Sequence, residues 1–508
     1  MSSLRTVEHR HVDQGRPAMT SRPTTRTIES RSIDYVPASE RHGKVWRQGP
    51  FWFLGNFQPF TLSLGLIGPA LGLDLTWTII ASVLGILFGT LFMAFHAAQG
   101  PTLGLPQMIQ SRAQFGYRGV IVPLVATLFT FVAFNVVDVV IIKEGLAGIF
   151  GWDTTLVAVT ITLVAAVLAI VGHDWLHQAF IGLFVLSLPL WIALTIGILA
   201  GGAGGEAADP GLGFSWAGVI SQFTVVAAYN VTYAPYVSDY SRYLPTATRT
   251  RSIVGAVFWG AAGSPLWLIP IGAWMATHTG TTDALVGIRD GGDAVISGLG
   301  SLLAVVSVLA LVATMGLNAY SAMLTVVTGA DSLRAIRPTA GLRVGVIVVL
   351  AIGWLVLSLA LTDSVGALFT SLTLMLYLLT PWTAVNLVDF FLVRRGHYAI
   401  TDLFTPRGIY GAWGREGLIA YALGLVAMVP FMVLHFSASV GFDGPVAERM
   451  DGIDIAFIVG LAVSSLSYVL LMRRVDLAAE EPAIDRSAAV LAEVDQEAGA
   501  DTVSVARA

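Results

Sequence analysis

Long apolar runs recur along most of the chain, and the polar intervals between them are no longer than loops. Each run has roughly the 20 apolar residues that a helix needs to cross the hydrocarbon core of a bilayer. The pattern predicts an all-α polytopic membrane protein with twelve transmembrane helices, at about residues 51–72, 75–98, 120–149, 155–172, 178–200, 214–237, 252–276, 299–328, 343–361, 365–392, 417–436 and 453–472. These helices form one predicted transmembrane domain over residues 48–474.

Two spans carry residues that interrupt a helix, and they occupy matching places in the chain. The first contains Gly-Asn-Phe-Gln-Pro-Phe-Thr at 55–61, and the sixth contains Asn-Val-Thr-Tyr-Ala-Pro at 230–235. Proline removes a backbone donor, and amide side chains can satisfy the freed groups. Because spans one and six are five apart, we predict a five-plus-five inverted repeat, over about 50–200 and 213–392, followed by two extra helices over about 417–472. The alternative is a pair of ordinary proline kinks.

The composition agrees with a membrane protein. Hydrophobic residues make up 55% of the chain and charged residues 12%, with a mean hydropathy of +0.75, whereas soluble domains carry about 25% charged residues. The chain has no cysteine. Disulfides, thiol catalysis and cysteine-based metal sites are therefore excluded.

The distribution of positive charge predicts the orientation in the membrane. All but three of the 28 lysines and arginines fall in the two tails or in loops on the same side as the tails. The exceptions are Arg289 and Arg449 on the opposite side and Lys143 within the third span. Because positively charged loops stay in the cytoplasm, both tails are predicted to be cytoplasmic and the protein to lie in the plasma (cell inner) membrane. The basic tail 1–47 and the alanine-rich, acidic tail 475–508 are predicted to be disordered.

Polar side chains in two other spans reach the middle of the membrane. The third span places Phe131, Asn135 and Asp138 on one helical face. A carboxylate in hydrocarbon costs several kcal/mol unless it is protonated, paired or hydrated, so Asp138 is either functional or a structural partner of a polar helix. In the eighth span, the Thr314 hydroxyl could coordinate a small cation and the Asn318 amide could bind an amide-like ligand edge. The alternative for both is helix packing.

Two motifs and the twelve-span layout carry a resemblance to a known family. Asp239–Pro245 reads DYSRYLP, and Gly104–Met108 (GLPQM) is followed by Ser111–Gly119 (SRAQFGYRG). Over about residues 45–475 the chain resembles the nucleobase:cation symporter family, in particular its purine-cytosine permease branch. The resemblance implies a leucine-transporter-type fold, with two inverted five-helix repeats plus two C-terminal helices. It also implies a secondary active transporter that imports a nucleobase (cytosine or purine) or related nitrogen heterocycle by cation symport with alternating access.

The resemblance also implies site residues. The family's aromatic residue and the amide four positions later in the third helix correspond to Phe131 and Asn135. The aromatic position six residues before the motif aspartate corresponds to Tyr233, and the amide of the eighth helix to Asn318. A flat, edge-polar ring needs an aromatic face and a few fixed amides. The full set of predicted substrate-binding residues is Gln58, Phe131, Asn135, Asn230, Tyr233 and Asn318, with Tyr229 as a further stacking candidate.

The coupling ion stays open between sodium and a proton. The small and hydroxyl residues of a sodium site in related family members correspond to Ala313 and Thr314, which supply a single hydroxyl. Asp138 is the third candidate for cation coupling. Asp239 and Arg242 follow the broken sixth span at the cytoplasmic surface, and we expect them to support gating instead of contacting substrate. No cofactor, nucleic acid or obligate protein partner is expected besides the ion, the substrate and the lipid bilayer.

Other classes of function find less support in the sequence. His173 and His177 have metal-ligand spacing but lie in a short cytoplasmic turn without an obvious third ligand. The glycine-rich loop 201–213 lacks the Lys-Ser/Thr of a phosphate-binding loop. We therefore expect no enzyme activity. A channel would need a filter-like segment or a ring of charge, and a heterocycle receptor that does not transport remains an alternative.

The predicted orientation can be tested with single cysteines, because the chain has none of its own. A cysteine at Thr246 should be protected from an impermeant thiol reagent in right-side-out vesicles, and one at Ala207 should be labelled. The opposite pattern would contradict the orientation.

Overall fold

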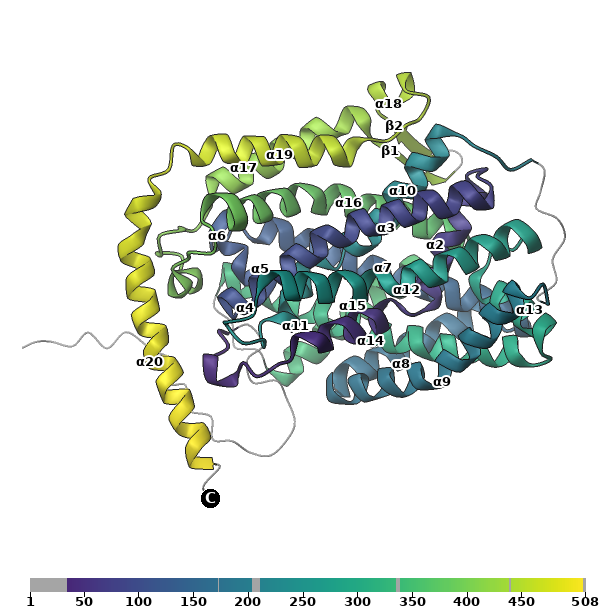
Figure 1. Cartoon of the computed structure of the whole chain (residues 1–508), viewed down its shortest axis with the longest axis horizontal. Helices are drawn as coiled ribbons and strands as arrows, with labels where there is room; N and C mark the ends of the chain where they lie inside the picture. The colour runs from purple at the N-terminus through teal and green to yellow at the C-terminus, as the bar shows by residue number, and fades with distance from the viewer. Residues whose placement is uncertain (1–33, 172, 203–210, 335–338, 438–439, 506–508) are drawn as a thin grey trace, which may run out of the picture.

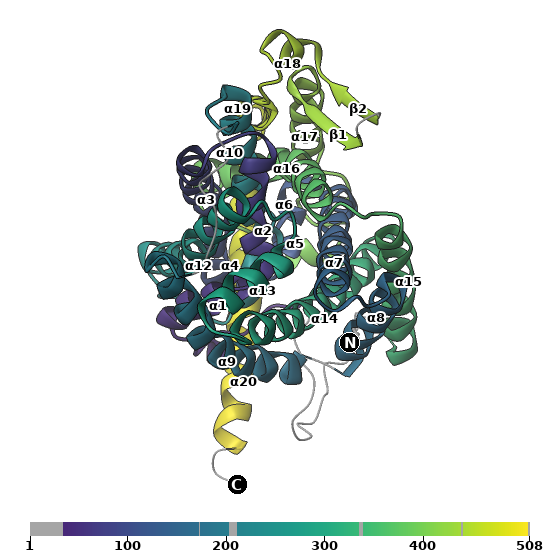
Figure 2. The same ribbon diagram turned by 90° about the vertical axis from the view of Figure 1, so that its right-hand side faces the viewer.

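Helices form almost the whole protein. The computed structural model describes residues 34–171, 173–202, 211–334, 339–437 and 440–505, and most of its helices run along one long axis as a bundle (Figures 1 and 2). Seven described helical stretches are long and apolar enough to cross a membrane. The chain is therefore a multi-pass helical membrane protein.

The main helices follow the predicted spans in order. They are α1 (Gln48–Asn56), α2 (Pro59–Ala70), α3 (Leu75–Ala97), α7 (Ile121–Phe150), α8 (Thr154–Val171), α9 (His173–Leu199), α10 (Trp216–Val231), α11 (Ala234–Ser241), α12 (Thr250–Thr279), α14 (Leu299–Leu333), α15 (Ala340–Leu359), α16 (Ser364–Val388), α17 (Arg415–Met428) and α19 (Ala456–Met472).

The remaining elements lie at the two ends of the bundle. The end near the first and last described residues, here called the tail end, has η1 (Ala38–Glu40), η2 (Val45–Arg47), α4 (Gln99–Leu103), α5 (Gln107–Gln110), α6 (Arg112–Phe115), η3 (Asp389–Val393), η4 (Ile400–Phe404), η6 (Leu477–Glu480) and α20 (Glu481–Val505). The opposite end has α13 (Ala284–Val295), η5 (Val429–Phe431), strands β1 (Val433–Ser437) and β2 (Val440–Asp443), and α18 (Pro445–Arg449).

Both predicted interruptions are present, with different geometries. Between α1 and α2 the backbone leaves the helical region at Phe57 (φ −88°, ψ 71°) and becomes extended at Gln58 (φ −155°, ψ 163°). Pro59 then begins α2, where its missing N–H costs no helical hydrogen bond. Between α10 and α11, Thr232 and Tyr233 keep nearly helical angles. The sixth span therefore bends through a tight turn, whereas the first is unwound.

A buried amide pair fixes these two interrupted spans to each other. Asn56, the last residue of α1, donates to Asn230 Oδ1 of α10 at 2.9 Å and to the Ala261 carbonyl of α12 at 2.8 Å. Asn230 in turn donates to Thr90 Oγ1 of α3 at 2.6 Å and to Ala261 O at 3.2 Å. Both hydrogens and the oxygen of the Asn230 amide are thus paired, and the network joins α1, α3, α10 and α12.

Helices α3 and α10 pack with their backbones almost in contact. A Cβ atom at Gly89 of α3 would lie 2.1 Å from the carbonyl oxygen of Ala227 in α10. Small residues at such points let membrane helices approach closely.

The N-terminal segment is only partly as predicted. Residues 1–33 lie outside the described residues. The remainder of the predicted tail packs against the tail end, where Val36 N donates to Gly104 O at 3.0 Å and the buried Arg41 donates to Pro101 O at 3.0 Å.

The prediction of a disordered C-terminal tail differs from the structure. Residues 481–505 form α20, and Ser487 accepts a hydrogen bond from Thr401 N at 3.1 Å. The many alanines and glutamates of this segment are strong helix formers. The prediction of disorder, which was based on the acidic composition, gave too little weight to this helix propensity.

The eleventh predicted span is also shorter than expected, because its helix α17 ends at Met428. Pro430 follows in η5, and the chain continues into the β1–β2 hairpin. Helix α13, which lies between the seventh and eighth spans, was not predicted. Asp283 caps it by accepting from Leu285 N and Val286 N.

Gly89→Ala should destabilise the protein, because the added methyl group forces α3 and α10 apart. Overpacking of this kind costs about 1–3 kcal/mol, so the thermal midpoint of the detergent-solubilised protein should fall. Gly255→Ala in α12 is the matched control, since no atom lies within 4 Å of its added Cβ. Equal midpoints for the two variants would contradict the close packing.

Asn230→Ala should also lower the thermal midpoint, because Asn56 and Thr90 lose a buried hydrogen-bond partner, at a cost of about 1–3 kcal/mol. Asn318→Ala is the comparison, since this buried amide makes no hydrogen bond within the described part of the chain. Midpoints should be measured without ligand. A larger loss for Asn318→Ala than for Asn230→Ala would show that the network is not structural.

Candidate functional site

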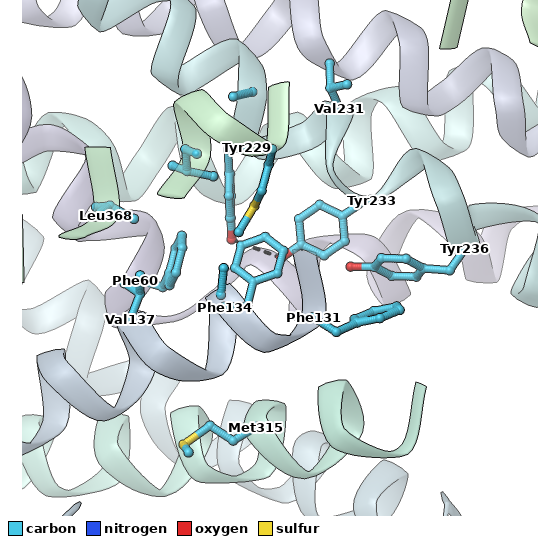
Figure 3. Packing of buried hydrophobic residues seen from close by; sticks show 14 of the residues in the cluster. Phe60, Phe131, Phe134, Val137, Tyr229, Val231, Tyr233, Tyr236, Met315 and Leu368 are labelled. Carbon is cyan, nitrogen blue, oxygen red and sulfur yellow. Dashed lines mark hydrogen bonds between the residues drawn. The ribbon is translucent and has the colours of Figure 1, made fainter. Parts of the chain in front are cut away.

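A column of aromatic rings lines the point where the two interrupted spans meet α7 (Figure 3). The tyrosines at 229, 233 and 236 are spaced four and three apart and project toward α2 and α7. The column pairs Phe60 with Tyr229 (5.5 Å between ring centroids, 19° between planes), Phe134 with Tyr233 (6.0 Å, 35°) and Phe131 with Tyr236 (5.1 Å, 40°). All six rings are buried in the core of the bundle.

The tyrosine hydroxyls form a chain with a fixed direction. The Thr61 hydroxyl donates to the Asn56 carbonyl at 2.6 Å, which uses its only proton. Tyr229 must therefore be the donor in its 2.7 Å contact with Thr61. Tyr233 donates to Tyr229 at 3.3 Å. Along this chain the Tyr233 oxygen is left free to accept a hydrogen bond.

Helix α7 carries two unpaired acceptors. Asn135 Nδ2 donates to the Met315 carbonyl of α14 at 3.2 Å. Because a carbonyl only accepts, this contact fixes the orientation of the amide and leaves Asn135 Oδ1 buried without a partner. Asp138 Oδ1, one turn further on, is also buried without a partner.

Helix α14 reaches the break in the first span. Thr314 Oγ1 lies 2.8 Å from Gln58 Oε1 and 3.1 Å from Ala310 O. These three neutral oxygens are the kind of ligand that suits a small hard cation. Ala313 and Asn318 are buried on the same helix. In the described residues there is no group of three or more His, Cys, Asp or Glu side chains that could hold a metal ion.

The structure separates the predicted site residues into three groups. Phe131 and Tyr233 lie at the aromatic column, Asn135 lies one turn from Phe131 on α7, and Gln58 lies at the adjacent break. Asn230 is directed into helix packing, so its amide is not available to a ligand.

The third group lies at the tail end. Asp239 Oδ1 accepts from Gln107 N at 2.9 Å, and Arg242 donates to Asp34 O at 3.4 Å. Arg242 also stacks on Tyr243, 5.0 Å from the ring centre. These contacts place the DYSRYLP motif against the α4–α5 segment and the N-terminal segment.

Four residues at the column are not among the predicted site residues: Phe60, Thr61, Phe134 and Tyr236. Thr61 directly follows the break, and Tyr236 continues the helical spacing of Tyr229 and Tyr233. Those two signals were present in the sequence. The direction of Phe60 and Phe134 depends on how α2 rotates after the break, which no local pattern gives.

A buried polar chain closes the tail end. Gln107 donates to Gln99 (2.8 Å), Gln99 to Asn386 (2.7 Å), Asn386 to Gln114 (3.3 Å) and Gln114 to Asp389 (2.6 Å). Arg394 then pairs with Asp389 at 2.7 Å and with Glu480 at 2.8 Å, which anchors the segment leading into α20. Burial disfavours the charge on Arg394, but these carboxylates outweigh it and hold the pKa of Arg394 well above its usual range.

The opposite end is hollow. A cavity of about 1950 Å³ lies between α2, α7, α12 and α16, and its lining includes Ile67, Val136, Thr279 and Gly366. None of the paired rings of the aromatic column is part of this lining.

Comparisons with known proteins agree on one family. Residues 35–460 match the family model of permeases for cytosine/purines, uracil, thiamine and allantoin. The chain is 33% identical over 450 residues to the "putative purine-cytosine permease YxlA" of Bacillus subtilis, covering 88% of this chain and 96% of that protein. It is 24% identical over 465 residues to the purine-cytosine permease fcyB of Emericella nidulans, covering 87% and 88%.

Solved structures share the fold. Mhp1, a nucleobase-cation-symport-1 family transporter, in a closed conformation with bromovinylhydantoin bound, superimposes with a TM-score of 0.67 at 18% identity, over 88% of this chain and 95% of that one. Mhp1 in its inward-facing conformation gives a TM-score of 0.65 at 18% identity, over 89% and 94%. The family model covers most of the chain, and a relative above 30% identity extends over nearly all of it. The chain thus belongs to the nucleobase:cation symporters, the family of permeases for cytosine and purines, uracil, thiamine and allantoin.

Proposed function

We propose that the protein is a secondary active transporter that imports a nucleobase, either cytosine or a purine, or a related nitrogen heterocycle. The observation that carries this proposal is the unpaired Asn135 Oδ1, one helical turn from Phe131 of the aromatic column. A buried acceptor without a donor costs about 1–3 kcal/mol. A ring that stacks on Phe131 or Tyr233 and donates an N–H to this oxygen removes that cost.

We also infer that transport proceeds by alternating access in a twelve-span, five-plus-five inverted-repeat architecture. The interruptions in spans one and six, both at the aromatic column, support this inference. The cavity at one end and the polar chain at the other fit a state that is open to the outside. In this proposal the tail end faces the cytoplasm and Asp239 and Arg242 support the inner gate, because both lie where α11 meets the α4–α5 segment.

Symport with a cation supplies the driving force. One positive charge moving inward gains about 2.3 kcal/mol per 100 mV, enough to concentrate a neutral substrate roughly fifty-fold. For sodium, the candidate ligands are Thr314, whose hydroxyl faces the Gln58 amide oxygen, and the adjacent Ala313. For a proton, the candidate is Asp138, which is buried without a partner.

In the proposed pocket, removing an amide or the stacking ring should lower the affinity for the heterocycle. Asn135→Ala and Asn318→Ala should weaken binding about tenfold or more, because each removes a buried hydrogen bond worth about 1–3 kcal/mol. Phe131→Leu should weaken the binding of several bases together, since stacking does not depend on the edge groups. Binding of labelled cytosine and adenine to purified protein, with saturable uptake into proteoliposomes, checks both.

Asn230→Ala is the matched control, because its amide is used in packing and its loss should leave the affinity of the folded protein unchanged. The pocket is contradicted if the three site variants fold and bind every tested heterocycle like the parent. Binding without uptake would instead indicate a receptor, and current that does not saturate would indicate a channel.

A further inference from the structure

Two buried oxygens on α7 lack partners inside the protein, and they lie on one face. Asn135 Oδ1 and Asp138 Oδ1 are both fully covered and unpaired. Residues three apart on a helix have Cβ atoms about 5–6 Å apart, which lets both oxygens reach the edge of one small ring. Phe131 and Phe134 share this face and contact Tyr236 and Tyr233.

Structural packing does not account for this pair of oxygens. Buried polar groups in native proteins are nearly always hydrogen-bonded, and a buried carboxylate also needs a cation or a proton. Within the described part of the chain, Asp138 makes neither a hydrogen bond nor an ion pair. A ligand that supplies the missing hydrogen-bond partners, together with a proton on the carboxylate, accounts for both atoms.

The charged and titratable groups around α7 do not neutralise Asp138. Lys143 on the same helix donates to Leu361 O at 2.6 Å and pairs with Glu144 at 3.4 Å. Tyr229 and Tyr233 interact with Asp138 electrostatically from the facing helix, but their hydroxyls bond to Thr61 and to each other.

Helices α2 and α8 carry no ionisable side chain. The remaining helices packed against α7 carry these ionisable groups: Tyr320 and Asp331 on α14, Arg343 on α15, Tyr377 on α16, and Arg289, Asp290 and Asp293 on α13. Asp331 is hydrogen-bonded to Tyr117, Tyr377 to Asp454 and Asp293 to Ser301. Arg289 forms an ion pair with Asp290.

Resting on the transport function proposed above, we propose that Asp138 contacts the substrate directly in its protonated form and carries the coupling proton. The carboxylic acid O–H donates to an acceptor atom on the ring edge. Asn135 Oδ1 accepts the N–H that lies next to that atom. The proton is then part of the substrate-binding surface.

This pair of groups selects a chemical class of substrate. It fits a planar nitrogen heterocycle whose edge has an acceptor beside a donor, such as the ring nitrogen beside the amino group in cytosine or adenine. The ionised carboxylate cannot donate, so it would face the ring acceptor with negative charge and reject the same edge. Binding of the proton therefore raises the protein's affinity for the nucleobase, and binding of the nucleobase raises its affinity for the proton by the same factor.

The pH dependence of binding tests the proposal on the parent protein itself. In sodium-free buffer, affinity for cytosine or adenine should be constant at low pH. Above the pKa of Asp138 in the free protein it should fall about tenfold per pH unit, because only the protonated form binds. In that same pH range, the weakly buffered protein should take up protons from solution when cytosine or adenine is added.

Asp138→Asn keeps a donor and an acceptor without a titrating proton. This variant should bind within about tenfold of the parent at low pH, lose the pH dependence, and exchange substrate across proteoliposomes without accumulating it in a pH gradient. Glu144→Gln is the matched control on the same helix and should keep both the pH dependence and the accumulation. Adenine should bind at least tenfold more tightly than purine, which lacks the amino group, and Asn135→Ala should abolish that difference.

The outcomes separate this inference from the proposed function. If the parent binds and transports bases with sodium dependence and no pH dependence, the role of Asp138 is refuted and the transport function stands. Retention of pH-driven accumulation by Asp138→Asn refutes the role as well. If the parent binds no heterocycle at all, the proposed function fails and this inference fails with it.

Discussion

The structure depends on how it satisfies the backbone groups that the break in the first span exposes inside the membrane. Lipid offers no hydrogen bonds, so each freed group costs several kcal/mol unless the protein pairs it. Thr61 donates to Asn56 O across the break, and Ser264 of α12 donates to Phe53 O in α1. Because Thr61 also accepts from Tyr229, the pairing of the backbone at the break and the orientation of the Tyr229 hydroxyl are one arrangement.

The two ends of the bundle use polar groups in opposite ways. At the tail end, neutral amides and the ion pairs of Arg394 form one chain from Gln107 to Glu480. At the other end lies the cavity between α2, α7, α12 and α16. Ion pairs that are buried cost desolvation, and removing one partner leaves an uncompensated charge. Arg394 and its two carboxylates therefore hold the tail end together as a unit.

The helices and the positions of both interruptions could be predicted from the sequence, because proline and amide residues within an apolar run interrupt a helix whatever its neighbours are. It also placed Phe131, Asn135 and Asp138 on one face, since helical spacing is fixed. It does not give the direction of the Asn230 side chain, which is set by Asn56 and Thr90 from helices far away in the chain. The C-terminal helix α20 differs from the prediction for another reason, because the prediction from composition and charge gave too little weight to the helix propensity of its alanines and glutamates.

The site uses neutral groups almost throughout, and that choice has a physical reason. Hydroxyls and amides do not carry the desolvation cost of an ion, so they can be buried at the aromatic column with hydrogen-bonded partners alone. Asp138 is the exception, because its charge depends on a proton that the solution can supply or remove. A permanently charged residue in that position would need a permanent counter-ion. A titratable residue needs a counter-ion only when it is ionised. The free-energy cost of its buried charge can therefore be linked to whether the substrate is bound.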